Sequence, residues 1–345
     1  MQVRTLRWIM FAALCGSVIV AVSATLLFAW RSLNAPMTIA AGGDTLDVVP
    51  GTSLTGISDE LSRRGILEMA WFLNAYARLS GDAKRIQAGE YLISSGTSPR
   101  GLLDQLVSGR VYLYDLTIIE GWTFADVVAA LRNHEAVDAR GFDPESVMAE
   151  LGDPELHPEG QFYPDTYRFP RGTPAVVVLR QAHQAMQDLL EEAWGEYRAT
   201  TVLETAYEAL TLASIIEKET ALSEERRRIS GVFHRRLERG MRLQADPTVI
   251  YGLGNDFDGD LRRADLTRDT PYNTYTRSGL PPTPIALPGQ QSVSAAVDPA
   301  PGSELYFVAT GLGDGSHYFS TTLDEHREAV ARYQSGTPLA GTSEQ

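Results

Sequence analysis

The sequence predicts a mixed α+β protein with a single N-terminal transmembrane helix, a small α+β subdomain and a larger mixed α+β domain. Three observations lead to this prediction. A run without charge near the N-terminus is long enough to cross a bilayer, a strand–glycine–helix pattern then recurs three times, and amphipathic helices precede a hairpin in the C-terminal half. The length of 345 residues also exceeds that of one typical domain.

Ile9 to Trp30 is a run of 22 residues without a charged side chain. As a helix it would extend about 33 Å, which matches the hydrocarbon core of a bilayer. Arg4 and Arg7 precede the run and Arg31 follows it. Because positive charge favours the cytoplasmic side, this small excess predicts a short cytoplasmic N-terminus and an exported remainder.

We therefore expect cytoplasmic residues 1–7 and a transmembrane helix over 8–30, in a single-pass protein of the inner (cytoplasmic) membrane whose main body is periplasmic. The alternative is a cleaved signal peptide, since Val22-Ser23-Ala24 is typical of a cleavage site. The apolar run continues past that site, which favours an uncleaved anchor. The single cysteine, Cys15, lies inside the run, and a cysteine-free exported part suits an oxidising compartment.

Residues 31–43 are small and polar and are expected to form a linker. Beyond them, an extended apolar run, a glycine and a short amphipathic helix follow one another three times. The glycines are Gly51, Gly96 and Gly121, and hydroxyl residues after each of them supply helix N-caps. Positions +3, +6 and +10 from each glycine share one helix face; they are Leu54, Ile57 and Leu61, then Pro99, Leu102 and Leu106, then Phe124, Val127 and Leu131.

The first copy of this pattern, Val48 to Leu54 with Ile57, resembles a LysM module. LysM modules bind glycans that contain N-acetylglucosamine, so the resemblance implies a LysM-like subdomain, which we place over residues 44–112. Strand–glycine–helix units are common, and the alternative is a small packing unit without glycan contact.

The larger domain is expected over residues 113–333, followed by a mobile tail over 334–345. Amphipathic periodicity, glycine and proline content and strand-forming runs define its elements. They are helices over 176–194, 203–221 and 323–333, a mainly loop region over 246–289, and a hairpin of strands over 305–309 and 317–320.

The helix predicted over 203–221 carries the most informative pattern. From Ala209 to Ile216 it has no charge on any face, and such a helix is buried. Glu217 and Glu219 therefore lie at the edge of a core, about 200° apart around the helix. Apolar neighbours raise the pKa of a carboxyl and keep it protonated for general-acid chemistry. Bulkier neighbours favour Glu219, but the spacing leaves both residues open, and a solvated helix end is the alternative.

The loops that follow this helix combine aromatic rings with amides. Rings stack on sugar faces and amides bind hydroxyl and acetamido groups, so the composition is typical of a glycan cleft. The alternative is a set of proline-rich loops covered by tyrosines. The residues we expect to bind substrate are Gln244, Asp246, Tyr251, Tyr272, Asn273 and Tyr275.

Composition excludes several other classes of protein. The 30 basic and 44 acidic residues give a net charge of −14, so nucleic acid is not an expected partner, because it requires a basic surface. One cysteine and six histidines without a His-Glu-x-x-His spacing predict no metal site. The sequence also lacks a G-x-S-x-G elbow, a phosphate loop and a dinucleotide fingerprint, and we expect no cofactor.

Seven motifs occur in a fixed order along the larger domain. They are Ile119-Glu120-Gly121, Phe162-Tyr163-Pro164-Asp165-Thr166, residues 213–220 with Glu217-Lys218-Glu219-Thr220, residues 240–244, residues 246–252, Tyr272-Asn273-Thr274-Tyr275 and Gly279-Leu280-Pro281-Pro282. With the anchor and the LysM-like region, they resemble the YceG-like endolytic murein transglycosylases, also called MltG, over nearly the whole chain.

The resemblance implies a lytic enzyme that cuts the β-1,4 bond between N-acetylmuramic acid and N-acetylglucosamine within strands, beside the membrane. The product would carry a 1,6-anhydro-muramoyl end, and the role would be glycan strand termination and cell wall organisation. The catalytic residue of the family falls on Glu219, which would act first as acid and then as base without a second carboxylate. The implied partners are peptidoglycan glycan strands, the membrane and, by analogy, peptidoglycan synthases.

Two other functions remain open on the sequence. A non-catalytic glycan-binding scaffold of the wall-synthesis machinery would not need Glu219. A hydrolytic muramidase would use Glu219 together with Asp246 and a water molecule.

Overall fold

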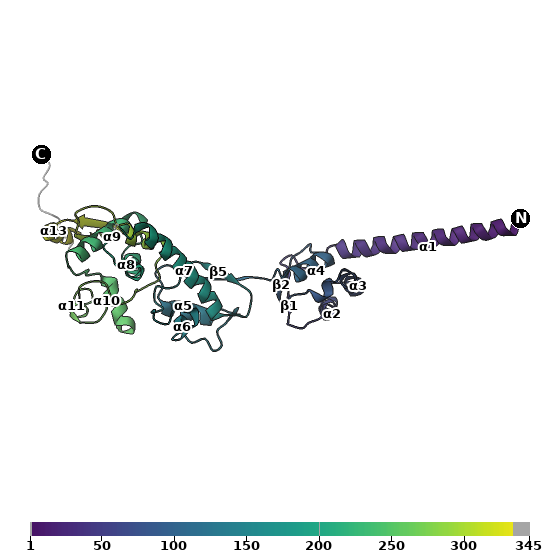
Figure 1. Ribbon diagram of the computed structural model, residues 1–345, viewed down its shortest axis with the longest axis horizontal. Coiled ribbons are helices and arrows are strands. Elements are labelled where there is room, and N and C mark those ends of the chain that lie inside the picture. The colour runs from purple at the N-terminus through teal and green to yellow at the C-terminus, as the bar shows by residue number, and fades with distance from the viewer. Residues whose placement is uncertain (1, 200, 334–345) are drawn as a thin grey trace, which may run out of the picture. The chain divides into compact units, whose positions relative to one another are not determined.

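The computed structural model describes residues 2–199 and 201–333, and the expected tail over 334–345 lies outside them. Figure 1 traces the elements from α1 to α13. The first elements are α1 (Gln2–Asn34), β1 (Asp44–Val48), α2 (Leu54–Arg63), α3 (Ala70–Ser80), η1 (Asp82–Lys84), β2 (Gly89–Ile93), α4 (Pro99–Ser108) and β3 (Tyr114–Thr117).

The chain continues through a second, more helical series of elements, which confirms the predicted mixed α+β class. They are α5 (Phe124–Asn133), β4 (Val137–Asp138), α6 (Val147–Leu151), β5 (Thr166–Phe169), β6 (Thr173–Pro174), α7 (Ala175–Tyr197), α8 (Ala206–Glu219), α9 (Ser223–Glu238), α10 (Asp246–Leu253), η2 (Gly254–Asp256), α11 (Arg263–Thr267), α12 (Gln290–Val297), β7 (Tyr306–Ala309), β8 (His317–Ser320) and α13 (Leu323–Tyr333).

The chain divides into two compact units. Unit 1 extends to Tyr114 and also takes in Phe169–Gly172, whereas unit 2 begins at Asp115 and holds the rest of the described chain. The division falls close to residue 113, where we expect the larger domain to begin.

Helix α1 contains the uncharged run and is longer than expected. Its segment Met10–Asn34 is long and apolar enough to cross a membrane. The helix continues past Trp30 to Asn34, and Leu33 and Met37 are buried in the core of unit 1. The backbone N–H of Met37 also donates to the carbonyl of Thr97 at 2.9 Å. The expected linker over 31–43 is therefore partly helical and packed.

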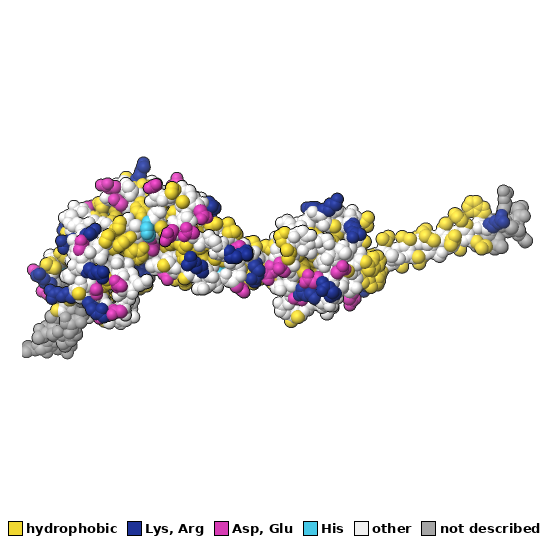
Figure 2. Space-filling view, turned by 90° about the horizontal axis from the view of Figure 1, so that it is seen from below, with side chains coloured by type: hydrophobic (Ala, Val, Ile, Leu, Met, Phe, Trp, Pro, Cys, Tyr) yellow, Lys and Arg dark blue, Asp and Glu magenta, His cyan; other side chains and the backbone are white. Residues whose placement is uncertain are grey.

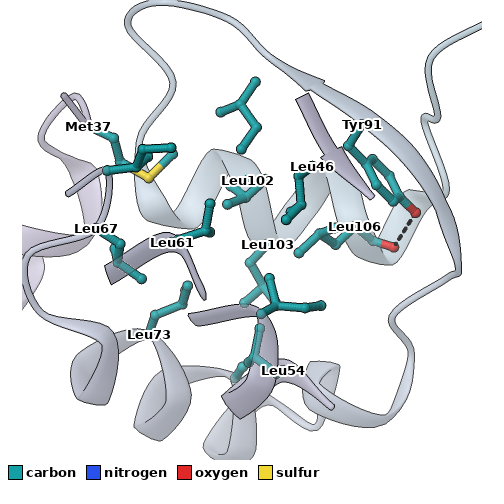
Figure 3. Packing of buried hydrophobic residues seen from close by; sticks show 14 of the residues in the cluster. Met37, Leu46, Leu54, Leu61, Leu67, Leu73, Tyr91, Leu102, Leu103 and Leu106 are labelled. Carbon is teal, nitrogen blue, oxygen red and sulfur yellow. Dashed lines mark hydrogen bonds between the residues drawn. The ribbon is translucent and has the colours of Figure 1, made fainter. Parts of the chain in front are cut away.

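The core of unit 1 lies between the β1–β2 sheet and helices α2, α3 and α4 (Figure 3). The two strands are antiparallel, with Leu46 opposite Tyr91. Tyr91 is fully buried, and its hydroxyl donates to the carbonyls of Gln87 at 2.8 Å and Leu106 at 3.5 Å. This satisfies the one polar atom that the ring brings into an apolar core.

The threefold strand–glycine–helix pattern is confirmed. Strands β1, β2 and β3 precede helices α2, α4 and α5, and these helices begin at or next to the predicted residues. Gly51, Gly96 and Gly121 have φ angles of +89°, +88° and +79°, which side chains other than glycine adopt with strain. Ser53, Ser98 and Thr123 accept a backbone N–H three residues on, as N-caps do.

Helix α8 forms the centre of unit 2. It packs against α7, α9, α10 and α12 (Figure 1). Residues 209–216 are all buried, which confirms that a helix without charge on any face lies in a core. The predicted hairpin is confirmed as the antiparallel pair β7–β8, and the closing helix as α13.

The region over 246–289 is less loop-like than its proline and glycine content predicts. It contains α10, η2 and α11. Pro247 lies in the first turn of α10, where a missing N–H costs nothing, so this proline starts a helix instead of breaking one.

Candidate active site

Two glutamates stand at the C-terminal end of α8. The helix starts at the N-cap Thr205, whose side chain accepts from the N–H of Glu208 at 3.1 Å, and it ends at Glu219. Because the helix is buried over two turns before this end, both carboxyls lie at the edge of the unit 2 core. Their side chains meet different surroundings.

Glu217 is held by three donors from two other elements. Its Oε2 accepts from the N–H of Gly289 at 3.0 Å and from Oγ of Ser292 at 2.7 Å, both at the start of α12. Its Oε1 accepts from Nη2 of Arg226 in α9 at 3.3 Å, and the Glu217 side chain is 7% exposed. The Glu217 carboxylate therefore joins α8, α9 and α12, which is a structural role.

Glu219 has no such partners. Across residues 2–199 and 201–333, no hydrogen bond or ion pair involves its partly buried side chain. Burial and, to a smaller extent, the charge of Asp246 raise the pKa of the Glu219 carboxyl to about 8, against the opposing effect of Arg236. A carboxyl with this pKa is mostly protonated at neutral pH and can donate a proton.

Asp246 and Tyr275 lie within electrostatic reach of Glu219. Asp246 is exposed and opens α10, and the hydroxyl of Tyr275 donates to its Oδ1 at 2.5 Å. Burial and the neighbouring Asp246 carboxylate both raise the pKa of the Tyr275 phenol. The hydrogen bond from Tyr275 thus fixes the negative charge of Asp246 near the protonated carboxyl of Glu219.

Arg236 is a further residue of the site that the sequence interpretation missed. It is buried, and it donates from Nε to the carbonyl of Leu305 and from Nη1 to the carbonyl of Leu243, each at 2.7 Å. Burial lowers the pKa of its guanidinium, while Glu219 opposes that change. Its burial and its electrostatic contact with Glu219 distinguish it from the neighbouring Arg235, which also donates to distant carbonyls.

Gln244 sits in a strained backbone conformation beside these residues. Among the described residues it is the one other than glycine with a positive φ, at +52°. Its backbone N–H donates to the carbonyl of Thr274 at 3.2 Å, and its side chain is exposed. Such conformations cost energy and cluster at functional sites.

Tyr251 and Tyr272 form a second cluster together with Glu159. Their rings are 4.9 Å apart at an interplanar angle of 65°, and the Tyr272 hydroxyl lies 3.0 Å from Oγ1 of Thr283. The Tyr251 hydroxyl donates to Oε2 of Glu159 at 3.0 Å, and the N–H of Phe124 donates to Oε1 at 2.9 Å.

Glu159 is the second functional candidate that the sequence interpretation missed. Its side chain is 3% exposed, and burial raises the pKa of its carboxyl to about 7. The available signal was its position, directly before the aromatic segment that starts at Gly160.

The expectation that Asn273 contacts substrate needs correction. Its side chain is 1% exposed, and Nδ2 donates to the carbonyls of Asp265, Leu266 and Arg268 at 3.1, 3.2 and 2.7 Å. Its Oδ1 accepts from the N–H of Tyr275 at 2.8 Å. The Asn273 amide is therefore committed to backbone partners, and it fixes the loop that carries Tyr275.

The structure thus brings Glu219, Asp246 and Tyr275 together, with Arg236 behind them, and pairs Tyr251 and Tyr272 around Glu159. In the described part of the chain, no group of three His, Cys, Asp or Glu side chains could hold a metal ion. What the first cluster offers chemically is a single proton-donating carboxyl beside a fixed negative charge.

Comparisons with known proteins agree on one family. The family model described as YceG-like matches residues 46–332. A Bacillus subtilis (strain 168) protein named endolytic murein transglycosylase is 30% identical over 313 residues, which is 84% of each chain. A protein of the same name from Streptococcus pneumoniae serotype 2 is 25% identical over 84% of this chain, which spans 58% of that relative's length.

A solved structure gives the same result. The crystal structure of a yceG-like protein from Listeria monocytogenes superposes with a TM-score of 0.50 and 30% sequence identity. The match covers 84% of this chain and 99% of the other. Because the family model covers most of the chain, this protein belongs to the YceG-like family.

Proposed function

We propose that this protein is a membrane-anchored endolytic murein transglycosylase. It cleaves the bond between N-acetylmuramic acid and N-acetylglucosamine inside glycan strands and leaves 1,6-anhydro-muramoyl ends. The observation that carries this proposal is the Glu219 carboxyl, which has no partner among the described residues and a pKa raised to about 8. The names of the bacterial relatives support the same activity.

Glu219 supplies the acid of the first step. It donates its proton to the glycosidic oxygen, the bond from that oxygen to C1 of the muramoyl residue breaks, and the electron pair stays on the oxygen. Positive charge develops at C1 in the oxocarbenium-like transition state. A carboxyl that is protonated at neutral pH is in the right state for this step.

The same residue supplies the base of the second step. The Glu219 carboxylate accepts the proton of the muramoyl 6-hydroxyl, and the oxygen of that hydroxyl bonds to C1. The products are the anhydro end and a free 4-hydroxyl on N-acetylglucosamine, and Glu219 has regained its proton. No water is consumed, so the reaction needs no second carboxylate.

The neighbouring residues assist in ways that their contacts support. Burial and the Asp246 charge keep Glu219 protonated before the first step, and the same charge would stabilise the positive charge that develops at C1. Gln244, with its exposed side chain, and the Tyr251–Tyr272 pair would contact the sugar, while Asn273 positions the Tyr275 loop.

The location of the enzyme belongs to the same proposal. Helix α1 anchors the chain in the cytoplasmic membrane, and the arginine excess before it favours a periplasmic catalytic unit. Glycan binding by the LysM-like region and work beside peptidoglycan synthases stay predictions from the resemblance.

Mass spectrometry of strand ends tests this function against its two alternatives. The purified full chain is incubated with glycan strands, with Glu219→Gln as the control. Anhydro ends made by the wild type and absent with the variant support the transglycosylase. Reducing ends would support a muramidase that uses Asp246 and water, and intact strands would support a non-catalytic scaffold.

A further inference from the structure

Unit 1 is packed directly onto the outer end of α1. Ala29 contacts the unit 1 core and Leu33 is part of it, together with Met37 just after the helix. Helix α1 packs against both α3 and α4. The span and the first folded unit therefore form one body, without a free tether between them.

A chain of aromatic rings leads from the span to α3. The rings of Phe28 and Phe72 are 5.8 Å apart, and Trp71 is stacked on Phe72 with centroids 3.7 Å apart. Phe28 lies three residues before Arg31, which is about 4.5 Å along a helix. The start of α3 therefore lies at the level where the uncharged run ends.

The exposed face of α3 is unusual for a surface in water. It consists of Trp71, Ala75, Arg78 and Leu79, which share one side of the helix because of their spacing. Trp71 is 62% exposed and Leu79 is 90% exposed, and this face carries no acidic residue. In Figure 2, hydrophobic side chains gather where α1 meets unit 1.

A cavity of about 330 Å³ opens at the same level. Its walls include Phe28, Met37, Leu67 and Phe72, and Arg31 lines it as well. Glu68 also lines the cavity, and polar and apolar atoms share its wall nearly equally, as at the boundary between lipid headgroups and acyl chains.

We propose that unit 1 is seated on the outer surface of the bilayer through this α3 face, with phospholipid as its partner. The inference rests on the proposed anchoring by α1, because the α3 face is continuous with the end of the span. Tryptophan and arginine at headgroup level, with leucine reaching the acyl boundary, are what an interfacial helix uses. Unit 1 then holds a fixed height above the membrane.

Site-directed fluorescence in the full chain tests the seating. Cys15→Ala gives a cysteine-free background, into which Trp30→Cys, Trp71→Cys, Leu79→Cys or Ser108→Cys is introduced singly and labelled with an environment-sensitive dye. Each protein is reconstituted in phosphatidylethanolamine–phosphatidylglycerol vesicles with or without headgroup-nitroxide lipid. Ser108 is the matched control, since it is exposed at the far end of α4, about 14 Å along the helix from Pro99 in the cavity wall.

Labels at 30, 71 and 79 are expected to be quenched roughly twofold or more, and the label at 108 to remain nearly unchanged. If the label at 30 is quenched but the labels at 71 and 79 stay as bright as the label at 108, the contact of α3 with the bilayer is contradicted, whereas the membrane anchor is supported. A bright label at 30 would overturn both anchor and seating, whereas formation of anhydro ends, measured on the same samples, reports on the proposed activity separately.

Discussion

Two sides of one helix end can be compared directly in this protein. On one side of α8, Glu217 receives two donors from the start of α12 and an arginine from α9. On the other side, two residues further, Glu219 lies in a partly buried place without a hydrogen bond or ion pair in the described chain, beside the like charge of Asp246.

The difference shows that partners, more than burial, decide what a carboxyl does. Both side chains leave the same apolar helix, so local sequence gives them nearly the same setting. Donors fix Glu217 as a link between helices, because a paired carboxylate is stable inside a protein. Burial without donors, with a like charge nearby, keeps the Glu219 carboxyl protonated and able to transfer its proton.

The largest effect we expect is on the activity of Glu219→Gln. The variant cannot donate or accept the catalytic proton, so formation of anhydro ends should fall by about 10²–10⁴-fold, measured as kcat by mass spectrometry. Glu217→Gln, assayed at a temperature where it is folded, serves as the control and should retain much more activity. Equal losses in the two variants would remove the distinction between the two sides.

The next largest effect is on the stability of Glu217→Gln. The amide leaves the buried Arg226 guanidinium without a counter-charge, so the free energy of unfolding should drop by about 3 kcal/mol. Denaturant unfolding of the full chain, followed by circular dichroism, measures this drop in the free energy of unfolding. A variant as stable as the wild type would mean that the three contacts of Glu217 are not structural.

The opposite change in stability is expected for Glu219→Gln. The pKa of Glu219 in the folded chain is about 8, above its ordinary value of 4.5, so the folded state binds more protons between these two values. Stability is therefore lost as the pH rises from 4.5 through 8, and glutamine, which does not titrate, avoids the loss. The variant should be more stable than the wild type by about 1–3 kcal/mol at pH 8 and nearly equal to it at pH 4.

Asp246→Asn should shift the pH profile and reduce activity moderately. The wild-type kcat/KM is expected to decline as the pH rises through about 8, because Glu219 must be protonated. Removal of the Asp246 charge lowers the pKa of Glu219, so the decline should begin at lower pH, with about a two- to tenfold loss at neutral pH. A complete loss of activity with an unchanged profile would instead favour the muramidase that uses Asp246.

The smallest effect concerns a third carboxyl, Glu159, which is buried like the others but keeps only neutral donors. Tyr251→Phe removes one of them and should lower the free energy of unfolding by about 1 kcal/mol, measured by thermal unfolding. Since the Tyr251 hydroxyl lowers the pKa of Glu159, that pKa should also rise in the variant. No change in either quantity would mean that this hydrogen bond does not form in solution.

Periodicity was enough to predict the parts of the fold that depend on neighbours in the chain. The glycine turns, the N-caps and the buried stretch of α8 follow from residues within about three turns of each other. The packing of Leu33 into unit 1 was not predictable, because the residues that it contacts lie tens of positions later in the chain.

The site was predictable only in part for the same reason. The choice between Glu217 and Glu219 depends on Gly289 and Ser292, more than seventy residues away. Asn273 looked like a sugar-binding amide by composition, but its three carbonyl acceptors come from α11 and the turn after it. Arg236 carries no local signal that separates it from surface charges, and Glu159 carries only its position directly before the aromatic segment.

Titration of the Glu219 carboxyl itself is the most direct test of the central claim. Carbon-13 NMR of protein labelled at the glutamate carboxyls would follow the chemical shift of each carboxyl with pH. The signal that disappears in Glu219→Gln is then assigned to Glu219. We predict a signal with a midpoint near pH 8 that is absent from Glu219→Gln, while the high midpoint of Glu159, near 7, remains. If the signal lost in Glu219→Gln titrated near the ordinary value of 4.5, Glu219 would be ionised at neutral pH, and the account of the proton donor would be contradicted.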